Sequence, residues 1–262
     1  MNAIGLLSVI LFTLMAFVGG KQGVRSFFAL FLNLLVVILT VFFILNTSIN
    51  LLIITLIACV LISCINLFFI NEINDKTIAA FIATIITVTI LLLFIHLMTK
   101  YALIQGFSEE ETDEISGYSL YIGVDFVKIA TSVIIMSTIG AIMDVAISIS
   151  SSLHHLFRLN PLLTRKELFQ SGLNIGRDIL GTDANTIFFA FFGGYLGLLI
   201  WFKDLEYSFG EIVNSKVFSG EMITIFCAGI GIALIIPISA WMSTFILMRD
   251  KEKLDERKTS QN

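Results

Sequence analysis

Long apolar stretches separated by short polar segments make up most of this chain. Each stretch is long enough for a helix to cross a hydrocarbon core of about 30 Å. The stretches are continuous and do not alternate between apolar and polar positions, which favours helices over a barrel. The pattern predicts an all-α polytopic transmembrane helical bundle with about seven crossings, near residues 2–20, 26–45, 49–70, 77–99, 123–153, 176–202 and 221–248.

The composition agrees with this pattern and narrows the class of protein. Hydrophobic residues make up 57% of the 262 residues and charged residues 14%. Soluble domains average about 45–50% apolar and about 25% charged residues. We therefore expect an integral membrane protein whose first partner is the lipid bilayer. The sequence has no basic patch of the kind that nucleic acid requires, so no nucleic-acid partner is expected.

The distribution of basic residues predicts the orientation, because cytoplasmic loops are enriched in lysine and arginine. If the 154–175 loop and the tail are cytoplasmic, most of these residues lie inside. The inside set is Lys21, Arg25, Lys76, Arg158, Arg165, Lys166, Arg177 and five tail residues, against Lys100, Lys203 and Lys216 outside. The N-terminus is then outside and the C-terminus cytoplasmic.

The same reading divides the chain into four regions. Residues 1–100 form an N-terminal four-helix transmembrane region, and residues 101–122 form an acidic external loop. Residues 123–248 form a C-terminal three-helix transmembrane region, and residues 249–262 a cytoplasmic tail. Within the third region, residues 161–172 predict a short interfacial helix, because Asn160 suits an N-cap and Pro161 the first helical position.

A polar stripe follows one side of the fifth predicted crossing. At about 100° per residue, five small or polar residues fall on one side of this helix: Ser137, Gly140, Asp144, Ser148 and Ser151. Glycine and serine allow close helix approach and interhelical hydrogen bonds. Ionisable residues at membrane depth are costly and often functional. Asp144 is therefore the leading candidate for a functional residue.

The sixth predicted crossing carries a second stripe, at i, i+4, i+7 and i+11. Its residues are Asn174, Asp178, Gly181 and Asn185, with Thr182 beside them. If the two stripes face each other, Asp144 and Asp178 lie on one path that suits proton or cation exchange. Arg177 or Asn185 would then modulate the two carboxyl groups. Asp183 points away from this stripe and is a weaker candidate.

Structural interpretations remain open beside the functional one. The polar groups can simply hold helices together, with Asp144 salt-bridged to Arg177. Asp125 and Lys128 lie one turn apart near the outer end of the fifth crossing and are better read as a structural ion pair. The cysteines lack metal-site spacing, and no metal or cofactor is expected. No catalytic motif is present, and two facing aspartates only loosely permit an intramembrane protease, so an enzyme is not expected.

Two longer segments carry a family resemblance. The sequences STIGAIMDVAISISSSL and SGLNIGRDILGTDANTIFFAFFGG resemble the YibE/F family of bacterial multi-pass membrane proteins, over roughly residues 115–250. The resemblance implies a permease-like protein of the bacterial cytoplasmic membrane. It also implies a paralogous YibE/F subunit as a partner, beside the alternative of a homo-oligomer, and it assigns no substrate.

A looser likeness connects the chain to the membrane domain of SecDF and RND exporters. There too a Gly-x-x-x-Asp helix precedes a helix with a segment like Asp183-Ala184-Asn185-Thr186. This chain lacks their large external domain. The likeness implies coupling to protons or small cations.

The leading hypothesis is therefore a transporter or exporter subunit that works through Asp144 and Asp178. The alternative is a non-transporting membrane subunit that assembles with or stabilises a partner.

Overall fold

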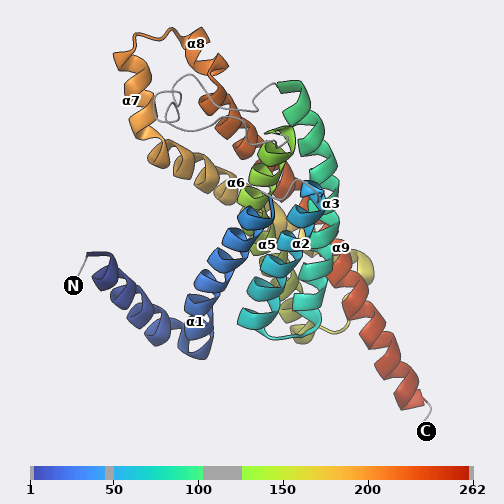
Figure 1. Ribbon diagram of the computed structural model, residues 1–262. Helices are drawn as coiled ribbons and strands as arrows, with labels where there is room; N and C mark the ends of the chain where they lie inside the picture. Colours follow the sequence, from blue (N-terminus) through green and yellow to red (C-terminus); the bar gives the residue numbers. More distant parts are fainter. Residues whose placement is uncertain (1–2, 45–49, 103–125, 260–262) are drawn as a thin grey trace.

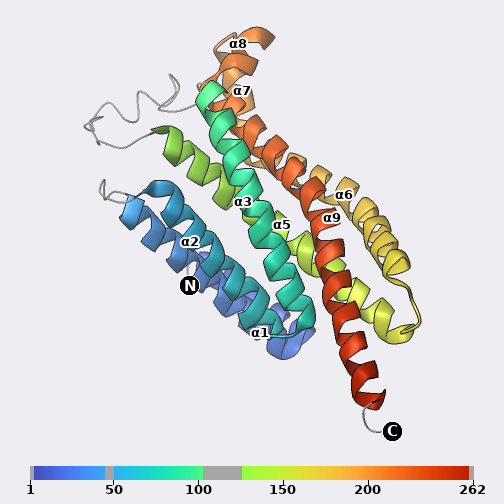
Figure 2. The same cartoon turned by 90° about the vertical axis from the view of Figure 1, so that its right-hand side faces the viewer.

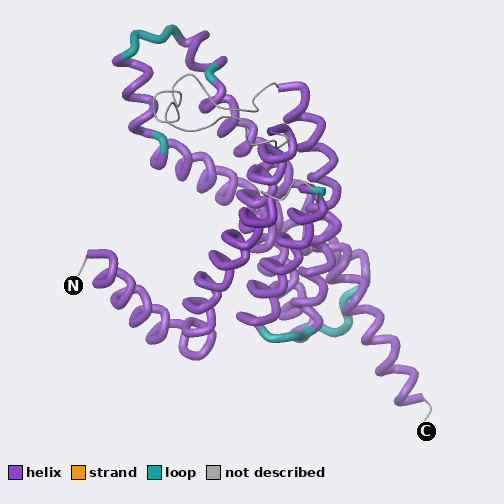
Figure 3. Tube along the Cα trace, in the orientation of Figure 1, coloured by secondary structure: helices purple, strands orange, loops and turns teal. Residues whose placement is uncertain are grey.

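Helices joined by short turns, with no strand, make up the part of the protein that the computed structural model describes, residues 3–44, 50–102 and 126–259 (Figures 1 and 3). The predicted all-α fold is confirmed. Most of the predicted acidic loop, 101–122, lies outside the described residues. The elements are α1 (Ala3–Ile44), α2 (Leu51–Cys64), the π-helix η1 (Ile65–Phe69), α3 (Asp75–Ala102), α5 (Phe126–Leu159), α6 (Arg165–Gly194), α7 (Leu196–Asp204), α8 (Phe209–Asn214) and α9 (Lys216–Thr259).

Five stretches among the described helices are long and apolar enough to cross a membrane: Ala3–Phe43, Leu51–Phe69, Asp75–Ala102, Phe126–Leu159 and Lys216–Arg249. The count is six if α6 and α7, which meet at a bend of 51°, are taken as one broken span. This is a membrane protein with several spanning helices. The predicted total of seven differs from this count, because the first two predicted crossings belong to one bent helix.

The bend in that helix, α1, is at Gly20, whose φ of 54° and ψ of −133° are not helical. In a straight helix, residues 15 apart along the chain would be separated by about 22 Å. The rings of Phe12 and Phe27 instead lie 4.9 Å apart. The two segments of α1 therefore fold back on each other, and Figure 1 shows the N-terminal segment running away from the bundle.

Polar contacts join the second segment of α1 to the turn between η1 and α3. Arg25 forms an ion pair with Glu72 at 2.7 Å, and Gln22 donates a hydrogen bond to Asn71 at 2.7 Å. Deeper in the bundle, the Asn33 side chain donates to Asn66 of η1 at 3.0 Å. These polar contacts hold α1 against the outer side of α2 and η1.

The centre of the bundle is the packing of α3, α5 and α9, with α1 and α2 on one side and α6 on the other (Figure 2). Its fully buried side chains are mostly aliphatic and include Leu91, Ile95, Ile142, Ile149, Leu153, Ile232 and Ile235. Buried hydroxyl groups pair between helices. Thr55 of α2 donates to Ser132 of α5 at 2.6 Å, and Ser243 of α9 donates to Ser150 of α5 at 2.9 Å.

The predicted interfacial helix at 161–172 is corrected by the structure. The helix begins at Arg165, because Thr164 and Glu167 form a reciprocal capping box, and it continues without a break to Gly194. Asn160 caps only the preceding turn, where its side chain accepts from Leu162 N at 3.3 Å. The expected crossing at 176–202 is interrupted at Tyr195, where α7 begins in a new direction.

Two glycines hold α6 close to α9. A Cβ atom added to Gly172 would lie 2.7 Å from Ala240 Cβ, and one added to Gly176 would lie 2.2 Å from Ile236 Cγ2. Neither position has room for a side chain. By contrast, a Cβ on Gly193 of the same helix meets nothing within 4 Å. Gly172 and Gly176 therefore determine which side of α6 faces the bundle.

We expect Gly176→Ala to lower the free energy of unfolding by about 1–3 kcal/mol, because the new methyl group overpacks the contact with Ile236. Gly193→Ala should have no such cost, since the position is open and alanine favours a helix. The measurement is reversible unfolding in mixed micelles. Adding Ile236→Ala to Gly176→Ala should restore part of the loss, and equal stability of both single variants would contradict this packing.

Candidate functional site

The polar stripe on α5 is present, but it lies on the outside of the bundle. Ser137, Gly140, Asp144 and Ser148 are all exposed, and Ser151 at the end of the stripe is partly buried. The opposite side of α5 carries Ile135, Ile139, Ile142 and Ile149, which are buried against the rest of the bundle. The predicted grouping of small and polar residues on one face therefore holds, and this face points away from the chain's own core.

The second stripe is also exposed. Asn174, Asp178, Gly181 and Asn185 lie on the outer side of α6, and Arg177 and Thr182 beside them are exposed as well. The inner side of α6 carries Leu168, Gly172, Gly176 and Phe191. The expectation that this stripe faces α5 is corrected, because the two glycines bring the opposite side of α6 against the bundle.

Asp183 lies close enough to Asp144 for the charges of the two carboxyl groups to repel each other. Asp183 is partly buried, while Asp178 is exposed. Five residues of α-helix turn the side-chain direction by about 500°, or about 140° beyond a full turn. Only one of the two aspartates can therefore approach α5, and it is Asp183. Its position seven residues after Gly176 was the sequence signal for this, because i and i+7 share a helix face.

Arg177 does not pair with Asp144. It makes a hydrogen bond to Asn174 Oδ1 at 3.5 Å, within its own helix. Among the described residues, Arg25 and Glu72 form the one ion pair. The predicted salt bridge between Asp144 and Arg177 is therefore not formed. The predicted pair of Asp125 with Lys128 cannot be placed, because Asp125 lies outside the described residues.

The outer face of α5 and α6 leaves room for another surface. A Cβ added to Gly140 or to Gly181 would meet nothing within 4 Å. The hydroxyl groups of Ser137 and Thr182 bond to carbonyls of their own helices, at 2.9 and 2.8 Å. The carboxylate of Asp144 has no hydrogen to donate to a carbonyl of its own helix. Exposing it to lipid at the centre of a bilayer costs about 2.5–3.5 kcal/mol of free energy. This face therefore needs water or a protein partner.

We use the name polar face for the exposed residues of both stripes taken together, although the α6 stripe is turned away from α5: Ser137, Gly140, Asp144 and Ser148 of α5, and Asn174, Arg177, Asp178, Gly181, Thr182 and Asn185 of α6. Within the described ranges, no group of three or more His, Cys, Asp or Glu residues is arranged to hold a metal ion. The side chains of the polar face can hydrogen-bond, and its aspartates can exchange a proton.

The family model described as YibE/F-like protein matches residues 7–249, from the first helical segment to the end of the last span. The chain belongs to the YibE/F-like family. The matched residues therefore include the N-terminal helices as well as the two helices of the polar face. The comparison with curated proteins found no match, and neither did the comparison with solved structures.

The opposite surroundings of two serines on α5 give a direct test of the polar face. Ser148 is exposed, whereas Ser150 is 1% exposed and bonded to Ser239 and Ser243. In a background without native cysteines, we expect Ser148→Cys to react with a water-soluble maleimide about tenfold faster than Ser150→Cys, because thiolate formation needs access to water. Mass spectrometry of proteoliposome samples measures both rates. Equal rates would contradict a hydrated polar face.

Proposed function

We propose that this YibE/F-like protein is a subunit of a bacterial membrane transporter or exporter in which the polar face lines a path for protons or small cations. The observation that carries the proposal is the exposed Asp144 in the middle of a membrane-length helix, with the bundle core on the helix's opposite side. Ionisable residues at this depth are a feature of ion pathways and proton relays. The proposal assigns no enzymatic reaction to the chain.

Asp144 is the central residue of this path, and Asp183 and Asp178 are its two neighbours along α6. Asp183 supports proton exchange with Asp144, because two carboxyl groups that lie close enough to repel each other are not both charged at low cost. Asp178 lies on the outer side of α6 and would serve a part of the path outside the chain's own bundle. A second subunit, either a paralogous YibE/F protein or another copy, would complete the wall that this chain leaves open.

The proposed orientation places the basic end of the bundle in the cytoplasm, following the bias of lysine and arginine. Contacts at that end join residues of distant segments: Arg25 with the turn at Glu72, and Lys251 with the Pro161 carbonyl at 2.7 Å. If both segments of α1 cross, and α6 with α7 crosses once, the total is seven. The N-terminus is then outside, the C-terminus is inside, and the bacterial cytoplasmic membrane is the location.

Replacing Asp144 tests the transport proposal. Purified protein in liposomes with an internal pH dye should carry a proton flux that follows an imposed membrane potential. We expect Asp144→Asn to reduce this flux by about tenfold or more, because the amide cannot bind and release a proton.

Asp204→Asn is the matched control, since Asp204 is exposed at the end of α7 and outside the polar face. It should leave the flux unchanged. A flux that persists in Asp144→Asn would remove Asp144 from the path. A wild-type protein no more conductive than empty liposomes would overturn transport by this chain alone.

The alternative function is that of a non-transporting subunit that assembles with or stabilises a partner. The open surroundings of Gly140 and Gly181 favour it, because small residues on an exposed helix face permit close approach of another helix. In this case the polar groups would pair across a subunit interface and carry no ion.

A bulky residue at Gly140 tests whether the polar face is an interface. We expect Gly140→Leu to leave the fold of the chain intact, since among the described residues no atom beyond the adjoining helix backbone lies within 4 Å of the new Cβ. Association should nevertheless fall, as measured by cross-linking in native membranes and by the mass of the purified particle. If the particle stays at the wild-type mass and the cross-links persist, the polar face is not the interface.

A further inference from the structure

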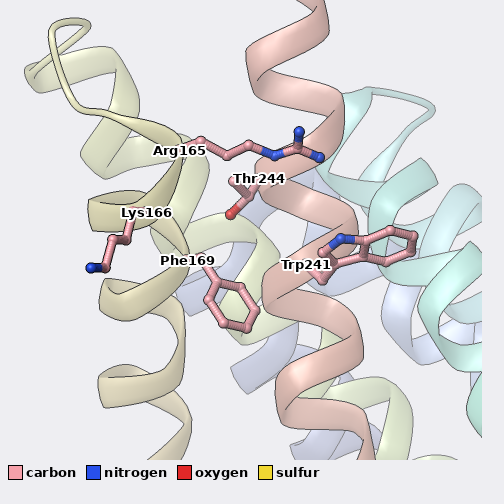
Figure 4. A pocket seen from close by; sticks show the side chains of 5 residues that line it. All are labelled: Arg165, Lys166, Phe169, Trp241 and Thr244. Carbon is pink, nitrogen blue, oxygen red and sulfur yellow. The ribbon is translucent and has the colours of Figure 1, made fainter.

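A cavity separate from the polar face lies between the start of α6 and the last part of α9. Its volume is ≈ 340 Å³, near the lower end of the range for small-molecule sites. The residues that line it are Arg165, Lys166 and Phe169 of α6 and Trp241 and Thr244 of α9 (Figure 4). The first two are cations and the next two are aromatic, so one site combines positive charge with an apolar wall.

The hydroxyl group of Thr244 is the unusual member of this set. The side chain is 1% exposed, and its Oγ1 has no hydrogen-bond partner. Other buried threonines, such as Thr87 and Thr99, donate to the carbonyl four residues earlier, at 2.9 and 2.8 Å, while Thr84 shares the lack of a partner. Buried polar groups are normally hydrogen-bonded. Figure 4 shows the Thr244 oxygen directed toward α6 and the cavity, where an acceptor on a ligand would satisfy it.

Arg165 is held across the gap between the two helices. Its guanidinium group lies 5.6 Å from the centre of the Phe245 ring, and this ring stacks with Trp241 at a centroid distance of 6.2 Å. An arginine fixed against an aromatic ring keeps its N–H groups available for a second, anionic partner. Within the described residues, no carboxylate forms an ion pair with Arg165 or Lys166.

The remaining charges at this end of α6 also matter. Lys166 points away from α9 in Figure 4, and its flexible chain can bring a second cation to the cavity mouth. Glu167 is the nearest acid along the helix, but its Oε2 accepts from Thr164 N and from Thr164 Oγ1, both at 2.8 Å. The carboxylate is therefore occupied by the cap. The positive end of the α6 dipole adds to the attraction for an anion.

The location indicates where the anion comes from. The cavity lies at the end of the bundle that carries the basic residues, and Trp241 and Phe245 beside it are 52% and 41% exposed. Tryptophan is enriched at membrane interfaces, and basic pockets next to spanning helices bind anionic head groups. We propose that this cavity binds the phosphate group of an anionic phospholipid, with Arg165 and Thr244 holding the phosphate oxygens and Phe169 and Trp241 contacting the acyl region.

Quenching of Trp241 by brominated lipid tests this site in the full-length protein. The Trp201→Phe background leaves Trp241 as the single tryptophan. In phosphatidylcholine nanodiscs, brominated phosphatidylglycerol at a low fraction should quench Trp241 more strongly than brominated phosphatidylcholine at the same fraction. Arg165→Gln should weaken the apparent affinity by about tenfold, since charge-assisted hydrogen bonds are lost. Thr244→Val should weaken it by a smaller factor without lowering the melting temperature in the absence of anionic lipid.

Arg158→Gln is the matched control, because Arg158 is an exposed cation near the same end of the bundle and does not line the cavity. It should change the affinity less than about twofold. Equal quenching by both lipids, or equal effects of Arg158→Gln and Arg165→Gln, would overturn the site. In neutral detergent, binding of inorganic phosphate that Arg165→Gln weakens as strongly would overturn the lipid assignment in favour of a free anion.

Discussion

A polar group inside a bilayer has no water to bind, and this constraint explains most of what α5 does. On its inner side, isoleucines fill the bundle, while Ser132 and Ser150 find hydroxyl partners on α2 and α9. On its outer side, Asp144 has no hydrogen bond or ion pair within the described residues. The polar groups on the inner side of α5 thus have hydrogen-bond partners within the chain. Asp144 on the outer side needs a partner from water or from another molecule.

The rotation of α6 follows from packing and determines which acid meets Asp144. Gly172 and Gly176 are the positions at which α6 can approach Ala240 and Ile236 of α9. With that side turned inward, Asp183 comes near α5 and Asp178 faces outward. The capping box of Thr164 and Glu167 fixes where the helix starts. Steric fit at two glycines therefore sets the electrostatic partner of an aspartate on a different helix.

Sequence reasoning predicted the helices and the one-sided stripe on α5, because both depend on local periodicity. It did not predict which side of a helix faces inward. In a membrane protein the lipid side and the core side are both apolar, so periodicity no longer separates them. The Thr164–Glu167 signature was present and predicts the start of α6 better than Pro161. The break at Gly20 coincides with the end of the first predicted crossing, where glycines and Lys21 interrupt the apolar run, but the sequence did not show that the two segments fold back on each other.

The length of α9 has a mechanical consequence. Its 44 residues extend about 66 Å, roughly twice the thickness of a hydrocarbon core. One continuous helix, with Pro237 inside it, therefore runs from the centre of the bundle, where Ile232 and Ile235 pack, to a stretch beyond the span that ends at Arg249. Lys251 on that stretch donates a hydrogen bond to the Pro161 carbonyl in the turn before α6. This contact couples the last part of α9 to the turn between α5 and α6, and through that turn to the helices on both of its sides.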